Sequence, residues 1–263
     1  MKCGIFKKPP YLLVITVLMS LAGCTHPHAN RDVLFQTSTI YALLDGLYDG
    51  NITCGELKKY GDIGIGTFDG LDGEMIGVNG KFFQIKADGV AYPVDDSMKT
   101  PFAMVTFFEP DQTARLNKPL GYQDLEKYLD QLLPTKNIFY AIKIEGGFNY
   151  IRTRSVPRQK KPYPPLVEAV KDQPVFEFHD VKGTIVGFRL PDYMKGINMP
   201  GYHFHFITEN RKAGGHLLEF KIRDARVEID YTDGSYMVLP KDDNFYRKDL
   251  TGDKQKEVEQ VER

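Results

Sequence analysis

The sequence lacks the features that would assign it to several large classes. Among its 263 residues, 34 Lys and Arg nearly balance 35 Asp and Glu, so the formal net charge is −1. The charges are scattered, without the basic stripe that a nucleic-acid partner would require, and we expect no such partner. Repeats and low-complexity segments are also missing, and 17 Phe with 15 Tyr argue against extended disorder. The chain should fold as one large domain or two small ones.

Long apolar runs are missing too, apart from a short one near the N-terminus. Residues 11–22 form an uncharged run of about twelve residues, short of the ~20 that a membrane-spanning helix needs. Three lysines precede the run, and it ends in Leu-Ala-Gly-Cys24, which resembles a bacterial lipobox. We predict a lipoprotein signal peptide over 1–23 and a tether over 24–32, although a plain signal peptide or a buried helix would also fit. The protein would be exported and lipid-anchored through Cys24 to the bacterial cell envelope.

Cysteine is scarce. Of three cysteines, Cys3 would be removed with the signal peptide and Cys24 would carry the lipid. Only Cys54 would remain, so no intramolecular disulfide is expected even in an oxidising compartment.

The full sequence has 24 Gly and 16 Pro, which indicates many turns and a chain rich in strands. Asn79-Gly80 between two β-type runs predicts a hairpin of 74–78 with 81–86. The apolar spacing of 122–133 predicts a helix that stops at Pro134, and the charged tail from Thr251 could form a loose helix. Ser38 and Thr53 fit the start of two short helices. Further strand pairs are expected for 138–144 with 148–154, 175–181 with 183–190, 202–208 with 216–222, and 226–231 with 236–239.

These elements predict an α+β fold that is rich in strands, with two packed subdomains and mixed and antiparallel sheets. The proline-rich stretch 157–165 is the best candidate boundary. We therefore predict an N-terminal α/β subdomain over 33–160, a C-terminal β-rich subdomain over 161–250 and a tail over 251–263.

Three histidines within fourteen residues carry the chemistry. His203 and His205 are two apart in an alternating apolar stretch, so both imidazoles would project from one strand face. An antiparallel return would bring His216 opposite this pair. Three neutral imidazoles can hold Zn²⁺ and leave a coordination position open, as in catalytic zinc sites. The ordinary alternative for the first pair is a polar patch on a half-buried strand.

A second metal fold, the cupin, nearly fits His203, His205 and Glu209. A cupin would need another histidine motif after Glu209, and His216 lacks its Pro-x-Gly prefix. Glu209 also falls where the hairpin should turn, away from the ligand face. A cupin-like metal enzyme therefore remains the alternative, together with a non-catalytic metal-binding lipoprotein. Imidazole ligands do not identify the metal, because they suit zinc, iron, copper and nickel alike.

The chain from about Val33 onward resembles the bacterial α-acetolactate decarboxylase family. The resemblance rests on GIGTFDGLDGEM (64–75), NGKFFQ (79–84), IRTRSVP (151–157), GYHFHFI (201–207) and GGH (214–216). It implies a zinc-dependent lyase that converts (S)-2-acetolactate to (R)-acetoin and CO₂. It also implies two α/β subdomains, a metal site near their interface, and a homodimer.

The resemblance also assigns residues. It implies His203, His205 and His216 as zinc ligands, and Glu74 and Arg154 as catalytic residues. It further places a glutamate of the tail near the metal; Glu257, Glu259 and Glu262 are the candidates, and Glu262 fits best. Thr67 is a weaker candidate for a hydrogen bond to substrate. Strand alternation places Arg152 and Arg154 on the same strand face, so the sequence alone does not choose between them. Without the resemblance, Glu74 could be an exposed strand residue beside a turn.

Overall fold

The computed structural model describes Met1 and residues 31–262. The predicted signal peptide beyond Met1, Cys24 and most of the predicted tether lie outside the described residues. Within the described part, no helix is both long enough and apolar enough to cross a bilayer.

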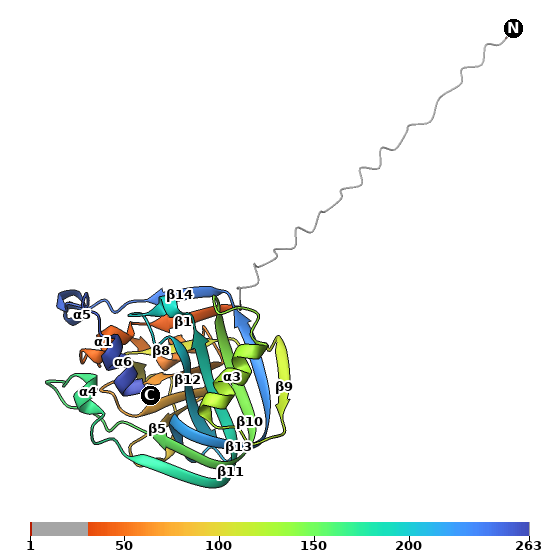
Figure 1. Ribbon diagram of the computed structural model, residues 1–263. Coiled ribbons are helices and arrows are strands. Elements are labelled where there is room, and N and C mark those ends of the chain that lie inside the picture. The colour runs from red at the N-terminus through yellow and green to blue at the C-terminus, as the bar shows by residue number, and fades with distance from the viewer. Residues whose placement is uncertain (2–30, 263) are drawn as a thin grey trace. The chain divides into compact units, whose positions relative to one another are not determined.

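Two β-sheets make up most of the fold (Figure 1). The larger sheet has the order β14 (Gly234–Val238), β1 (Val33–Thr37), β8 (Ala103–Thr106), β3 (Ile63–Thr67), β4 (Glu74–Val78), β5 (Lys81–Ile85) and β6 (Ala91–Pro93). The other has the order β10 (Phe139–Arg154), β11 (Val175–Leu190), β12 (Gly201–Thr208), β13 (Gly214–Thr232) and β9 (Gln112–Leu116). A short third pair joins β2 (Ile52–Thr53) to β7 (Lys99–Thr100).

The larger sheet is mixed, because β1 and β14 run parallel while its other pairs are antiparallel. In the second sheet β10 pairs with both β11 and β13, so that four antiparallel strands form a closed ring. The predicted α+β class with mixed and antiparallel sheets is confirmed.

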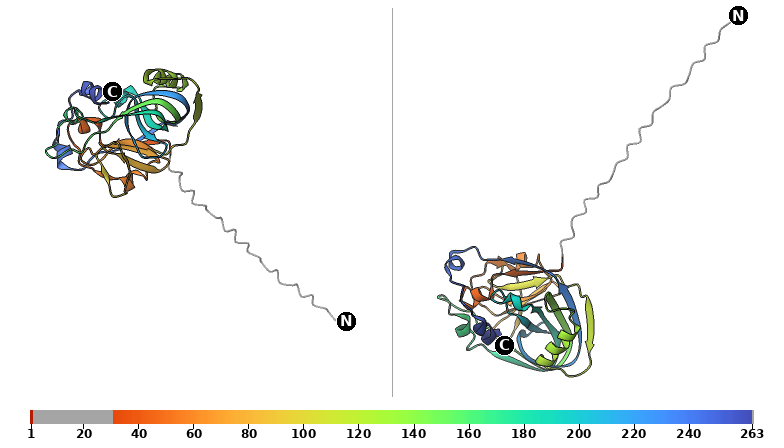
Figure 2. Two further views of the ribbon diagram at one scale, coloured as in Figure 1. Left: turned by 90° about the horizontal axis from the view of Figure 1, so that it is seen from below. Right: turned by 45° about the horizontal axis from the view of Figure 1, so that its top comes forward.

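Strand alternation on β12 sends its side chains to two different sides. Tyr202, Phe204 and Phe206 enter an apolar cluster with Leu125 and Leu129 of helix α3 (Tyr122–Leu132). The alternate residues turn toward the larger sheet, where a second cluster joins side chains of both sheets. Figure 2 shows the sheets as two packed layers. One face of β12 therefore looks into the space between the sheets.

Short helices gather at one end of this space. They are α1 (Ile40–Leu44), α4 (Leu166–Ala169) and α6 (Gln255–Glu262), and their apolar side chains share one cluster. Helices α2 (Cys54–Leu57) and α5 (Asp243–Arg247) and a 3₁₀ turn at Asp192–Met194 complete the elements. Helices of four to eight residues are unstable alone, so tertiary packing holds them in place.

Several local predictions are confirmed. Asn79 and Gly80 both have positive φ, 52° and 73°, in the tight turn between β4 and β5. Thr53 forms a capping box with Glu56 at the start of α2. The α3 and tail helices are present. The first helix is capped by Thr39 and not, as predicted, by Ser38.

Three of the predicted strand pairs are wrong. Residues 138–154 and 175–190 do not fold back, because β10 and β11 each continue as one strand through the expected turns. At Gly146-Gly147 the ladders to β11 and β13 occupy the backbone on both sides, and a register shift follows Gly147. The glycines therefore permit an irregular, closely packed strand and not a turn.

The third wrong pair is 226–231 with 236–239. Residues 214–232 form the single strand β13, and the segment after it leaves this sheet to pair with β1 as β14. Each sheet therefore contains strands from both sides of residue 160. β10, which precedes residue 160, belongs to the second sheet, and β14, which follows it, belongs to the larger sheet. The division into subdomains at residues 160 and 161 stays a prediction.

Candidate metal centre and active site

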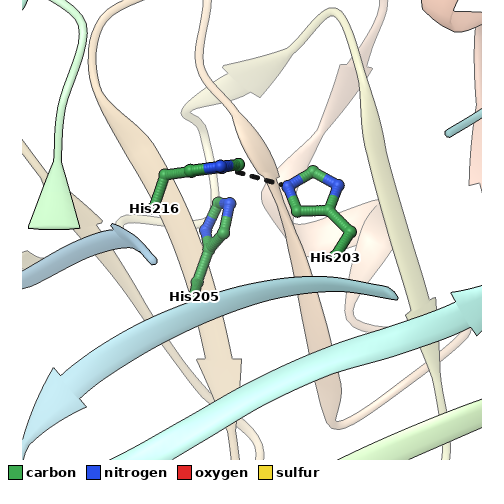
Figure 3. Close-up of side chains that lie close together, drawn as sticks. All are labelled: His203, His205 and His216. Atoms are coloured by element: carbon green, nitrogen blue, oxygen red, sulfur yellow. Dashed lines mark hydrogen bonds between the residues drawn. The ribbon is translucent and has the colours of Figure 1, made fainter. Parts of the chain in front are cut away.

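Three histidines meet on the face of β12 and β13 that looks toward the larger sheet. His203 and His205 alternate along β12, and His216 of β13 lies directly opposite His205. Each histidine offers one ring nitrogen, and these three nitrogens lie within 4.8 Å of one another. All three side chains are buried. Figure 3 shows the rings converging, with the contact between His203 and His216 dashed. The predicted hairpin return that brings His216 to the first pair is confirmed.

The hydrogen bonds of the rings show which nitrogens are free. His205 Nδ1 lies 2.7 Å from the carbonyl of Met75, to which it can only donate, so His205 Nε2 keeps its lone pair. His216 Nε2 lies 3.3 Å from the carbonyl of Glu262, which leaves its Nδ1 as the acceptor. His203 Nε2 lies 3.2 Å from His216 Nδ1.

These donors fit a metal ion. Ligand nitrogens about 2.0–2.1 Å from a tetrahedral ion lie roughly 3.3 Å apart, close to the spacing between His203 and His216. Burial, with a smaller contribution from Arg154, lowers the pKa of His203 to about 3. Burial likewise lowers the pKa of His205 and His216 well below the usual range. The imidazoles are therefore neutral, which is the form that binds metals.

Two carboxyl groups flank the histidines. Glu262 Oε2 lies 3.3 Å from His203 Nε2 and 3.9 Å from His216 Nδ1, while Glu74 Oε2 lies 3.6 Å from His205 Nε2. Burial raises the pKa of Glu74 to about 8, against the opposing charge of Arg154. Burial also raises the pKa of Glu262. Glu74 is not the exposed strand residue that its sequence context alone would suggest.

The structure distinguishes Arg152 from Arg154, which strand alternation alone could not do. Arg154 is buried, donates from Nη2 to the carbonyl of Val261, and lines the cavity beside the histidines. Its Nε is buried without a hydrogen-bond partner among residues 31–262. Arg152, two residues earlier on β10, also has a buried Nε without a partner among these residues, but it forms an exposed ion pair with Glu219 at 3.4 Å and does not line the cavity. Only Arg154 can therefore offer a buried donor to a molecule in the cavity.

Thr67 also lines the cavity, but its hydroxyl donates to the carbonyl of Gly73 at 2.7 Å. Gly73 has φ of 83° and precedes Glu74, so this hydrogen bond holds the turn that delivers Glu74. Thr67 is buried and its oxygen can still accept a hydrogen bond. Glu209 lies in the exposed turn after β12, as expected, and does not contribute to the site.

Apolar side chains that the sequence did not single out form the rest of the cavity wall. They are Leu43, Ile65, Leu71, Phe102, Val156, Leu166, Val170 and Val261. Most of them come from the end where the short helices gather. In the sequence they are ordinary core residues without a local signal, and the φ of 56° at Leu71, which is unusual for a bulky side chain, is visible only in the structure.

Comparisons with known proteins show the family of this chain. The family model of alpha-acetolactate decarboxylase matches residues 34–252. The chain belongs to the alpha-acetolactate decarboxylase family. The alpha-acetolactate decarboxylase of Methanosarcina mazei is 53% identical over 232 residues, which cover 88% of this chain and 81% of that protein. That of Bacillus subtilis strain 168 is 45% identical over 230 residues, covering 87% and 90%. Its crystal structure superposes with a TM-score of 0.85 over 87% of this chain and 98% of that one.

Proposed function

We propose that this enzyme decarboxylates (S)-2-acetolactate to (R)-acetoin and CO₂ at a zinc ion held by His203, His205 and His216. Membership of the alpha-acetolactate decarboxylase family supports the decarboxylation. The observation that carries the assignment of the site is that the histidines, two carboxyl groups and Arg154 converge on one buried cavity.

Loss of CO₂ from acetolactate leaves an electron pair that moves into the neighbouring ketone and generates an enediolate. Zinc bound by the three histidines would supply a Lewis acid that stabilises the developing oxyanion. The residues around it must then orient the substrate, keep water out and deliver one proton.

Arg154 is suited to orientation. Its buried Nε lacks a partner among the described residues, and a guanidinium can bind a carboxylate through parallel N–H bonds. A contact to the departing carboxylate stabilises the ground state, so it does not raise the rate by itself. Its contribution is to hold the breaking C–C bond perpendicular to the plane of the ketone.

Glu74 is suited to proton delivery. Burial favours its protonated form, and it lies beside His205, so its proton would reach only one face of the enediolate. Protonation of the carbon that lost CO₂ then gives one enantiomer of acetoin. Glu262 approaches the histidines from the tail and would complete the metal's surroundings or shield the intermediate from bulk water.

The test is to supply racemic acetolactate to the purified protein and follow acetoin on a chiral column, with His205→Ala as the matched control. The proposal expects (R)-acetoin from the wild type and only background decarboxylation from the variant. Racemic acetoin from the wild type would contradict the role given to Glu74, and a fully active variant would contradict the metal site.

Two proposals concern the whole protein. A lipid on Cys24 would place the enzyme at the cell envelope, where several acyl chains together hold firmly. Activity in the membrane fraction that becomes soluble in Cys24→Ser would support this, and soluble wild-type enzyme with an unmodified Cys24 would contradict it. We also propose that the protein is a homodimer, as the resemblance to the family implies. Analytical ultracentrifugation, which measures the mass of the particle in solution, tests this.

A further inference from the structure

The cavity at the histidines is too small for the substrate. Its volume is about 40 Å³, which suffices for a few water molecules, whereas acetolactate is several times larger. The histidines, Glu74 and Arg154 are all nearly inaccessible to solvent. The site is therefore narrow in this structure, and outward movement of part of its wall would make room for a substrate.

A second hollow lies next to this cavity. This outer recess has a volume of about 280 Å³ and is lined on one side by Tyr122, Gln123 and Glu126 of α3. Its other walls include Tyr202 and Leu218. Among the residues that the structure describes, Glu262 alone lines both the inner cavity and the outer recess. The last turn of α6 is thus the partition between them.

The two ends of α6 are attached differently. Before its first residue, Tyr41 Oη donates to Asp253 at 3.2 Å and accepts from the backbone N–H of Lys254 at 3.0 Å. Lys254 also bonds Asp45. At the other end, the polar contacts are made to the site itself, Val261 to Arg154 and Glu262 to His203 and His216, while the Val261 side chain packs in the apolar cluster with α1 and α4. A metal ion and a substrate would compete for these second contacts and leave the first ones intact.

We propose that the outer recess is the route to the metal and that the last turn of α6 is the gate across it. Residues 253–254 hold the helix in place while the turn that carries Glu262 swings outward. The recess then joins the inner cavity, and closure returns Glu262 to the histidines. This inference rests on the metal site of the proposed function, but it does not depend on which reaction occurs there.

The route can be tested by narrowing the recess with substitutions at residues that have no role in the proposed reaction. Gln123→Trp fills it from α3, and Leu218→Trp fills it from β13. Lys127→Trp is the matched control, because Lys127 lies on the same helix but is exposed and does not line the recess. The first readout is the rate at which a small dicarboxylate chelator, dipicolinate, removes metal from the loaded protein.

We expect both recess variants to slow metal removal at least fivefold and to lower kcat/KM for acetolactate by a similar factor, while Lys127→Trp matches the wild type. Wild-type rates of metal removal in both correctly folded recess variants would overturn the route. Bound metal without acetoin formation would instead refute the proposed function and leave the chelator test valid.

The gate has a separate test. Tyr41→Phe keeps the ring and its packing but deletes the hydroxyl that holds both Asp253 and Lys254. Looser attachment should make opening more frequent and speed metal removal about three- to tenfold. Slower removal in Tyr41→Phe would overturn the gate, because loosening the anchor of α6 cannot hinder the outward movement of its last turn.

Discussion

The two sides of the active-site cavity consist of different secondary structure. On one side, paired strands of both sheets carry the three histidines, Glu74, Thr67 and Arg154. On the other side, three short helices and the loops beside them supply apolar side chains and Glu262. The strands fix the chemical groups through ladders that extend far from the cavity, whereas the helices depend on packing against one another. We infer that the strand side performs the chemistry and the helix side governs access and shielding.

The largest effect is expected for the histidines. His203→Ala, His205→Ala or His216→Ala removes one of only three imidazoles, so metal occupancy and acetoin formation should fall together to background. Metal analysis and an acetoin assay on each variant check this. Full metal content and activity in any one variant would remove that histidine from the ligand set.

The next largest effect is expected for Glu74, the proposed proton donor on the strand side. Glu74→Gln is nearly isosteric and should retain the metal and the fold, but its amide cannot donate a proton at neutral pH. We expect kcat to fall about 10²–10⁴-fold. Steady-state kinetics with metal analysis test this, and near-normal kcat with normal product chirality would exclude Glu74 as the donor.

The corresponding change on the helix side is truncation after Glu259, which removes Glu262. Because Glu262 contacts two histidines, its loss should weaken metal retention about 10–100-fold. It should also admit bulk water to the enediolate and erode the enantiomeric purity of acetoin. If zinc affinity and chirality both stay unchanged, the tail serves only for packing.

The smallest effect separates the two arginines of β10. A lysine ammonium cannot reproduce the forked donors of Arg154, so Arg154→Lys should lower kcat/KM about tenfold or more. Arg152→Lys retains a surface ion pair with Glu219 and should change little. Equal, mild effects on steady-state kinetics would remove Arg154 from substrate binding and leave it only its structural contact with Val261.

The same division explains what the sequence could predict. The pattern His-x-His with His216 one hairpin away identified the strand side, because strand alternation and antiparallel return are local rules that place side chains directly. Glu74 and Arg154 came from the family resemblance, since nothing in a lone glutamate or arginine shows that it will be buried.

The helix side could not be predicted in the same way. Leu43, Leu166 and Val261 are ordinary apolar residues, and they meet only because three segments far apart in sequence pack together. The long strands were misjudged for a related reason. Gly146-Gly147 is a turn signal by local rules, but pairing to β11 and β13 on both sides overrides it.

The most direct test of the account is to strip the protein with a chelator and return zinc in small steps while acetoin formation is measured. The account predicts that the stripped protein is inactive and that activity rises in proportion to zinc until about one ion per chain is bound, with no rise for His205→Ala. Full activity in the stripped protein, or the same recovery in His205→Ala, would contradict it.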